Sequence, residues 1–432
     1  MPANTSTLDA LLKDKYGPAL RNELNDATPL LDMFQDAGKD INWQGRQCVE
    51  AVLVNRNRGS YFTAEGGQPP TAGNQQVENY QIPMRYQHGQ IRITTQLMKS
   101  SRSNEGAFAR GMRLEMDRLL DDMRIQRNFA MWGTGAGIRC LLSDDPGTGT
   151  DVDVDSPMNV AGTVNGARFI NVGDFVGFIN PLTGTLRAGG TREVTAIAAD
   201  GSDFTVAAAV DTALGDNDWV VKAYGTDASL AIANTDYNHL PMGLLGMVDD
   251  GSYVNIYFGL SRSTFQILQS TVISSVGALS ADVIQRGIDV AAQLGRGMPK
   301  YHCMHPSIRR AYLRVTEGDR RYTMGNLMDP DAGTKAAKDG QGGVGFGDVK
   351  LKVDHMAPYG MWFGVDPRSA YRYALVDGEW ADETGAVLKD VSGAVDTFDG
   401  TYRIYENFSL LSPNQSFRLE DISATVVSIH IN

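Results

Sequence analysis

The sequence predicts an α+β fold made of several packed modules, and three observations support this. The chain has 432 residues, of which 42% are hydrophobic. Because a single hydrophobic core stops growing at about 250–300 residues, a chain of this length is expected to form more than one packed module. Its 47 glycines and 16 prolines indicate many turns and strands rather than a helical bundle. The strongest helical periodicity lies in residues 104–131, while short runs of strand-forming residues recur along the rest of the chain.

Charge and cysteine content exclude several functional classes. The net charge is −12, and no basic stripe of the kind that binds a nucleic-acid duplex is visible. The cysteines Cys48, Cys140 and Cys303 are scattered and odd in number, which predicts reduced thiols in a cytosolic compartment. No stretch approaches about 18 consecutive apolar residues, and the first residues lack a secretory pattern, so neither a membrane span nor secretion is expected.

Residues 1–48 are expected to form an N-terminal arm. Leu8, Leu11, Leu12 and Tyr16 have the spacing of a short amphipathic helix, and residues 29–34 supply an apolar anchor. A segment with so few apolar residues cannot fold alone. We therefore expect it to lie against a larger body.

Residues 49–88 predict a long β-hairpin. Residues 49–54 and 80–86 have the composition of its two strands, and the glycines and prolines of residues 66–70 mark a turn-rich tip. Tyr61 and Phe62 lie between the strands. A projecting hairpin exposes backbone edges and aromatic side chains, which a monomer avoids unless a partner covers them.

Residues 104–131 predict one long helix. Its apolar positions recur at steps of 4, 4, 3 and 4, as one helical face requires. At about 1.5 Å per residue the helix would span roughly 42 Å, and Gly133 with Gly135 would end it. We interpret the apolar face as packing onto the sheet of its own subunit rather than as a groove for a partner. The face consists of Phe108, Met112, Met116, Leu119 and Met123.

Residues 141–228 predict a small all-β module, either a barrel or a sandwich. They carry 13 acidic and 4 basic residues, a net of −9 out of the −12 of the chain, so this module should be repelled from nucleic acid. The expected strands are 175–179, 192–197, 204–206 and 219–221, and the turn signals are Thr183-Gly184, Gly189-Gly190, Asp200-Gly201 and Gly215-Asp216.

The remainder of the chain returns to mixed α/β structure and ends in strands. Helices are expected over 281–294 and 306–315, with a strand at 301–304 between them. Residues 333–347 are expected to form a mobile loop. The late strands are expected at 371–375, 401–405 and 425–429.

Three motifs resemble ligand sites, and we favour a more ordinary interpretation of each. Residues 133–137 follow a helix and lack the Gly-Lys-Ser/Thr of a phosphate loop, so they indicate helix termination. Residues 151–155 (Asp-x-Asp-x-Asp) space their carboxylates as a calcium loop does, but the glycine and the closing glutamate of such a loop are missing. We favour a solvated acidic linker. Calcium binding at a contact between subunits stays an alternative. Residues 302–305 (His-Cys-Met-His) place neighbouring side chains on opposite faces of a strand, which favours a buried strand end over a metal site. No catalytic residue, cofactor or metal ligand is assigned.

Several local motifs occur in a characteristic order along the chain. Tyr86–Thr94 leads from the predicted hairpin toward the long helix, and Asn128–Gly135 ends that helix with an aromatic residue before Gly-x-Gly. Later motifs are Gly243–Gly251, Phe258–Ser263, Phe346–Asp354 and Asp396–Asn407. In this order they resemble the major capsid protein family of tailed bacteriophages, whose fold also occurs in encapsulins and in the floor of herpesvirus capsids. The resemblance covers most of residues 10–140 and 229–425.

The resemblance implies a shell-building protein that is not an enzyme. It would assemble into hexamers and pentamers of the icosahedral head, in the host bacterial cytoplasm, and would enclose double-stranded DNA in the virion without reading its sequence. The expected further partners are a portal, a decoration protein and a separate scaffolding protein; the alternative to the last is a scaffolding segment of this chain that is lost by cleavage. The implied parts are an N-terminal arm (1–48), an extended β-hairpin loop (49–88), a peripheral domain with a spine helix (89–140), an inserted β-barrel-like domain (141–228), an axial domain (229–365) and peripheral strands with the C-terminal return (366–432).

The resemblance also raises the question of how the shell is locked. Some members of the family form a Lys–Asn isopeptide bond through the extended loop, but this chain has no lysine between Lys39 and Lys99. We therefore expect non-covalent locking, because buried aromatic and arginine anchors usually carry most of the energy of an interface. The residues expected to make these contacts are Arg56, Arg58, Tyr61, Phe62 and Glu65.

Two other functions compete with this hypothesis. An encapsulin-like compartment would use the same fold to hold an enzyme cargo instead of DNA. A hydrolase or carbohydrate-binding protein with an appended β-domain would need a recognisable site, and the six histidines and the carboxylates do not form one in the sequence.

Overall fold

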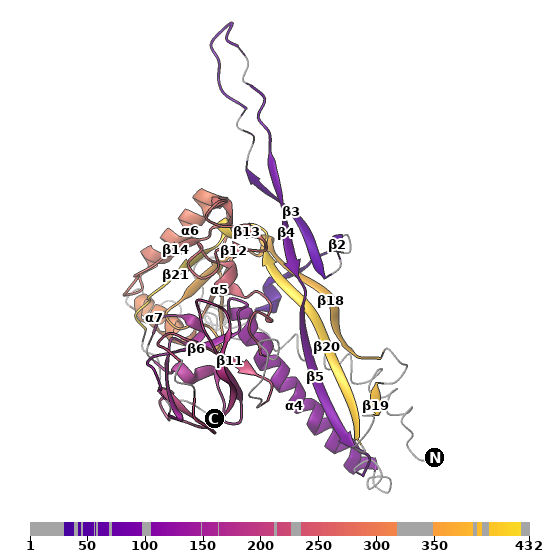
Figure 1. Cartoon of the computed structure of the whole chain (residues 1–432). Coiled ribbons are helices and arrows are strands. Elements are labelled where there is room, and N and C mark those ends of the chain that lie inside the picture. The colour runs from indigo at the N-terminus through magenta and orange to yellow at the C-terminus, as the bar shows by residue number, and fades with distance from the viewer. Residues whose placement is uncertain are drawn as a thin grey trace, which may run out of the picture.

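The computed structural model describes residues 30–38, 42–44, 46–55, 57, 59–68, 71–96, 105–147, 149–162, 164–210, 214–225, 235–317, 349–382, 387–390 and 397–424. Within them the fold is α+β with several sheets and few helices, as predicted (Figure 1). Some predictions lie outside the described residues, namely the helix at residues 8–16, Arg56, Arg58, the loop 333–347, the strand 425–429 and the side chains of Phe108 and Met112.

One five-stranded sheet forms the long side of the molecule. Its central strand β20 (Thr397–Leu410) pairs antiparallel with β5 (Arg85–Thr94) along one edge. The other edge of β20 pairs with β18 (Ala370–Trp380) and then with β19 (Leu388–Asp390), and β1 (Gln35–Asp36) adds to β18 in parallel. This sheet therefore joins segments that are some three hundred residues apart in sequence.

The long helix α4 (Glu105–Trp132) lies along this sheet (Figure 1). Met116 and Met123 are buried against the sheet, and Leu119 packs beside them. The helix ends one residue before Gly133, and Gly135 has a φ of +84°, a left-handed conformation that glycine adopts without a steric penalty. The buried sheet residues in the same cluster are Ile91, Ile93, Trp380, Val387, Leu388, Tyr402 and Ile404.

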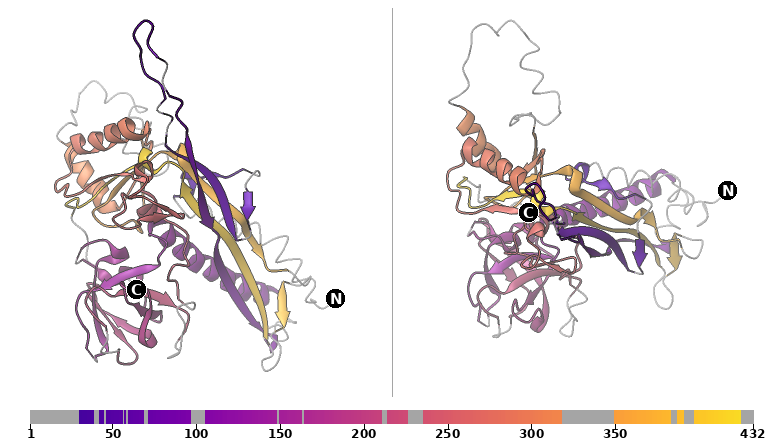
Figure 2. Two further views of the ribbon diagram at one scale, coloured as in Figure 1. Left: turned by 45° about the horizontal axis from the view of Figure 1, so that its top comes forward. Right: turned by 90° about the horizontal axis from the view of Figure 1, so that it is seen from above.

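The predicted hairpin is formed by β3 (Gln47–Asn55) and β4 (Gln76–Pro83), and β2 (Asn42–Gln44) pairs with the outer edge of β3. Strand pairing stops at Asn55 and Gln76, and the ribbon continues away from the body (Figures 1 and 2). At the tip, the hydroxyl of Tyr61 donates a hydrogen bond of 2.8 Å to the carbonyl of Gln68. This bond closes the end of the ribbon.

A second five-stranded sheet, in the order β14-β21-β17-β15-β16, carries two helices. Ser280 caps the first of these helices by accepting a hydrogen bond from the Val283 amide, as N-cap serines do. Ile284 and Ala291 of this helix are buried. The elements are β14 (Thr271–Ile273), α6 (Ala281–Gly295), β15 (Tyr301–Met304), α7 (Pro306–Glu317), β16 (Lys350–Val353), β17 (Trp362–Val365) and β21 (Phe417–Leu419).

The all-β segment is a closed barrel with the strand order β10-β7-β6-β11-β8-β9. Its interior is apolar, with Phe178, Phe204 and Val220 among the buried residues. It is also joined to the main body, because Met158 and Val160 belong to the central core that contains Trp132. The strands are β6 (Ile138–Leu142), β7 (Asp151–Asp155), β8 (Phe175–Ile179), β9 (Leu186–Ile197), β10 (Asp203–Val206) and β11 (Trp219–Ala223).

Two sequence interpretations of this barrel are wrong. Residues 151–155 are not a solvated linker but the strand β7, whose alternation buries Val152 and Val154 and leaves Asp151 and Asp153 exposed. The alternation that is typical of a strand was hard to recognise in the sequence, because only two valines mark its inner face among three aspartates. The turn expected at Gly189-Gly190 lies inside β9, where Gly190 adopts a φ of +73° within the strand.

A short connecting region lies between the barrel and the second sheet. It contains the helix α5 (Leu244–Met247) and the small hairpin of β12 (Ile256–Tyr257) and β13 (Leu260–Ser261). All residues of α5 are buried in the central core. This region therefore connects the barrel, the hairpin base and the second sheet through one core.

Candidate assembly interface

The tip of the projecting hairpin exposes aromatic side chains. Phe62 is fully exposed, Tyr61 is 58% exposed, and Glu65 is exposed at the turn between them and the returning strand. Further down the ribbon, Leu53 and Val77 face each other across the strand pair, and both are exposed. Exposed apolar residues grouped on one projecting element mark an interaction surface.

The base of the same hairpin is firmly held. Its other face buries Cys48, Val52, Tyr80 and Ile82 in the central core. The ring of Tyr80 lies edge-on to that of Tyr257, with centroids 5.4 Å apart. The exposed tip therefore extends from a base that is packed into the body.

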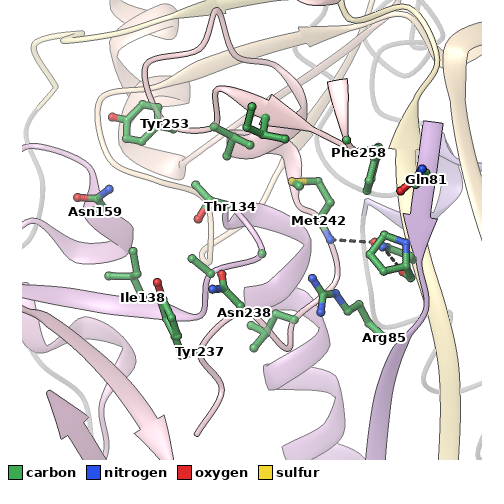
Figure 3. Close-up of a pocket in the computed structure, with 18 of the residues that line it drawn as sticks. Gln81, Arg85, Thr134, Ile138, Asn159, Tyr237, Asn238, Met242, Tyr253 and Phe258 are labelled. Carbon is green, nitrogen blue, oxygen red and sulfur yellow. Dashed lines mark hydrogen bonds between the residues drawn. The ribbon is translucent and has the colours of Figure 1, made fainter. Parts of the chain in front are cut away.

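A pocket of about 460 Å³ opens beside this base, where the hairpin, the barrel and the β12–β13 region meet (Figure 3). Asn407 of β20 organises one wall: its Oδ1 accepts a hydrogen bond of 2.9 Å from the Met242 amide, and its Nδ2 donates one of 2.6 Å to the Pro83 carbonyl. Gln81 and Arg85, on either side of Pro83, both line the pocket. Its apolar and aromatic lining includes Ile138, Trp219, Tyr237, Tyr253, Ile256 and Phe258.

Arg85 is the charged group of this pocket. Its side chain extends from the start of β5 toward Met242 (Figure 3), and its Nε is buried without a hydrogen-bond partner among the described residues. Burial lowers the pKa of this guanidinium. No aspartate or glutamate is among the residues that line the pocket in the described part of the chain.

Other arginines close to this region have acidic partners. Arg127 of α4 donates two hydrogen bonds, of 2.7 and 2.8 Å, to Glu406. Arg139 of the barrel donates a hydrogen bond of 2.8 Å to Asp236. A second pocket of about 550 Å³ is lined by these three arginines, Arg85 included, together with Asp236 and Glu406. Glu406 also lies opposite Arg85 in the β5–β20 pair, but its carboxylate is bonded to Arg127 and Arg372.

The motif His302-Cys303-Met304-His305 is part of the protein interior. His302 is fully buried, with Nε2 3.1 Å from the Pro299 carbonyl and Nδ1 accepting a hydrogen bond of 3.1 Å from the Trp362 indole. Burial raises the pKa of the Cys303 thiol to about 12, so this thiol is unreactive. Within the residues that the structure describes, no group of three metal-ligating side chains is present.

The structure separates the residues that the sequence singled out. Tyr61, Phe62 and Glu65 lie together at the hairpin tip. Met116 and Met123 lie far down the body, on the sheet side of α4. Sequence reasoning missed the pocket, because its lining comes from seven separate stretches of the chain and no local pattern marks Arg85.

None of the helices in the described ranges combines the length and the apolar composition of a membrane span.

No family model matches the chain, and no curated protein matches it. Among solved structures, the cyanophage A-1(L) capsid asymmetric unit is 13% identical with a TM-score of 0.48, over 91% of this chain and 93% of that chain. The capsid of the native GTA particle is 8% identical with a TM-score of 0.45, over 92% of this chain and 91% of that chain. A structure of Gordonia phage Cozz is 8% identical with a TM-score of 0.42, over 92% of this chain and 87% of that chain. The chain is thus distantly similar to these structures along most of its length.

Proposed function

We propose that this chain is the major capsid protein of a tailed bacteriophage, which self-assembles into the icosahedral head around double-stranded DNA. The observation that carries the proposal is the projecting hairpin, whose aromatic tip is not covered by the chain that bears it. Removing Tyr61 or Phe62 from water would stabilise an assembly by about 1.5–3 kcal/mol for each residue. Repeated over every subunit of a shell, such contacts give a large cooperative gain.

The order of the elements supports the same proposal. Hairpin, long helix, barrel and α/β sheet follow one another as the sequence resemblance implies. We infer that α4 is the spine helix, that the β5/β18/β20 sheet is the peripheral domain, and that the second sheet with α6 and α7 is the axial domain. The barrel would then be an inserted domain, and its acidic composition favours the outer surface of the shell.

The proposal includes partners and a mode of locking. Hexamers and pentamers of this chain would be joined non-covalently by the hairpin and by the N-terminal arm, with Arg56 and Arg58 pairing with carboxylates of neighbouring subunits. A scaffolding protein, a portal and a decoration protein would complete the head, and the role of this chain would be structural rather than enzymatic.

The test is assembly of the full chain expressed with its neighbouring genes, followed by electron microscopy and nuclease treatment. We expect shells that protect DNA; shells loaded with an enzyme instead would favour a compartment. Phe62→Ala should lower the temperature at which the shells dissociate, whereas Leu182→Ala, which removes a similarly exposed apolar side chain from the barrel, should not. A chain that stays monomeric at high concentration with its scaffold present would refute the proposal.

The predicted arginine contacts have their own test. Shells that carry both Arg56→Ala and Arg58→Ala should dissociate at a lower temperature than unmodified shells, because two charged anchors are lost at each contact. Unchanged thermal stability would rule out this part of the locking mechanism.

A further inference from the structure

We propose that the pocket beside the hairpin base binds the hairpin tip of a second copy of this chain, with Glu65 of that copy pairing with Arg85. The inference rests on the proposed function, because it needs an assembly of identical subunits. It deepens that function by naming the receptor for the tip and the charged pair at its centre.

The first argument is the missing partner of Arg85. Its buried Nε lacks a hydrogen-bond partner among the described residues. The Nε of Arg139 is unpaired as well, but Arg139 contacts Asp236 through another nitrogen, and Arg127 contacts Glu406, whereas no carboxylate in the described residues accepts a hydrogen bond from Arg85. Leaving a buried polar group unpaired costs about 1–3 kcal/mol, and more for a charged group. A carboxylate supplied from outside the chain would remove this cost, and a bidentate contact with a guanidinium is the strongest form of that pairing.

The second argument is the match between the pocket and the tip. The pocket offers one cation among aromatic and apolar walls, and Ile256 at its edge is exposed. Residues 59–68 at the tip carry Glu65 as their one charged side chain, close in sequence to the exposed rings of Tyr61 and Phe62. The carboxylate and the two aromatic rings of the tip are therefore chemically complementary to the arginine and the aromatic lining of the pocket.

The third argument excludes pairing of Arg85 with Glu65 of the same chain. Gln81 and Arg85 of the pocket lie at the base of the hairpin, and Glu65 lies in the turn at its far end. At about 3.3 Å per residue, the extended chain from Glu65 to Arg85 spans on the order of 60 Å. The rigid packing of the base prevents the ribbon from folding back over this distance. A Glu65 carboxylate that reaches Arg85 must therefore come from another copy. Glu406 of the same chain lies opposite Arg85, but Arg127 and Arg372 already occupy its carboxylate.

A disulfide-trapping experiment tests the contact directly. Glu65→Cys is combined in one chain with Gln81→Cys, because Gln81 lines the pocket and is exposed. The three natural cysteines are buried and contribute little background. Assembled shells should show covalent multimers on a non-reducing gel, and unassembled subunits and the single variants should not. Glu65→Cys with Leu182→Cys is the matched control and should give no multimers.

A double-mutant cycle measures the charge pairing. Glu65→Gln and Arg85→Gln should each lower the urea concentration at which shells dissociate, and the double variant should lower it no further, since either change removes the same pair. Additive effects would overturn the pairing.

The outcomes separate this inference from the proposed function. Absence of cross-links in intact shells would overturn the pocket assignment and leave the capsid function standing. Protection of a lone Gln81→Cys thiol from alkylation on assembly, without a cross-link to Glu65→Cys, would mean that another segment or protein fills the pocket and would also overturn it. Absence of any shell from the unmodified chain would overturn both.

Discussion

Glu406 is the centre of a charge network that ties α4 to the main sheet, and replacing it tests how much that network contributes. Its carboxylate accepts hydrogen bonds of 2.7 and 2.8 Å from Arg127 and one of 2.8 Å from the Nε of Arg372. All three side chains are at most 5% exposed. Burial by itself would raise the pKa of Glu406, but the two adjacent guanidinium groups outweigh it and lower that pKa.

We expect Glu406→Gln to lower the free energy of unfolding by about 3–5 kcal/mol, because it leaves two buried arginines without their shared counter-charge. The matched control is Glu379→Gln on the same sheet, whose side chain is 52% exposed and pairs with Arg403; it should cost about 1 kcal/mol or less.

Urea unfolding of the unassembled subunits, followed by circular dichroism, measures both changes under the same conditions. The depressed pKa also predicts that the contribution of Glu406 is present above its unfolded value of about 4.5 and is lost as the pH falls below it. Equal destabilisation by the two variants would show that the buried network contributes no more than a surface pair, and would refute the reasoning.

Two further changes probe the second sheet. Burial lowers the pKa of His302 to about 4, and its neutral ring already accepts a hydrogen bond from Trp362. The stability contributed by neutral His302 should therefore be present above its unfolded pKa of about 6.5 and fall as the pH drops toward 4; His302→Gln should flatten this dependence of the melting temperature on pH. Gly364→Ala should lower the melting temperature, because the added methyl group would collide with the buried ring of Phe417 and overpacking costs about 1–3 kcal/mol. Gly215→Ala, where nothing lies within 4 Å, should leave the melting temperature nearly unchanged, and a similar fall for both would contradict the packing argument.

Local patterns determined much of the secondary structure. The helix predicted over residues 104–131 runs from Glu105 to Trp132, because its apolar residues recur with the helical period and Gly133 follows them. The hairpin strands, the strand 301–304 and the helix from Ala281 were equally visible in neighbouring residues. The strand Asp151–Asp155 was missed because a strand of five residues with three aspartates has little apolar signal, and only closure of the barrel supplies its inner face.

The sequence by itself therefore determined the fold class, the long helix, the hairpin with its aromatic tip and the concentration of negative charge in one module. Tertiary structure alone decided that β5 pairs with β20, that the barrel closes, and that Arg85 lines a pocket to which the described residues contribute no aspartate or glutamate. The physical reason is range: helical and strand periods are set by residues a few positions apart, whereas the surroundings of a side chain are set by segments hundreds of residues away.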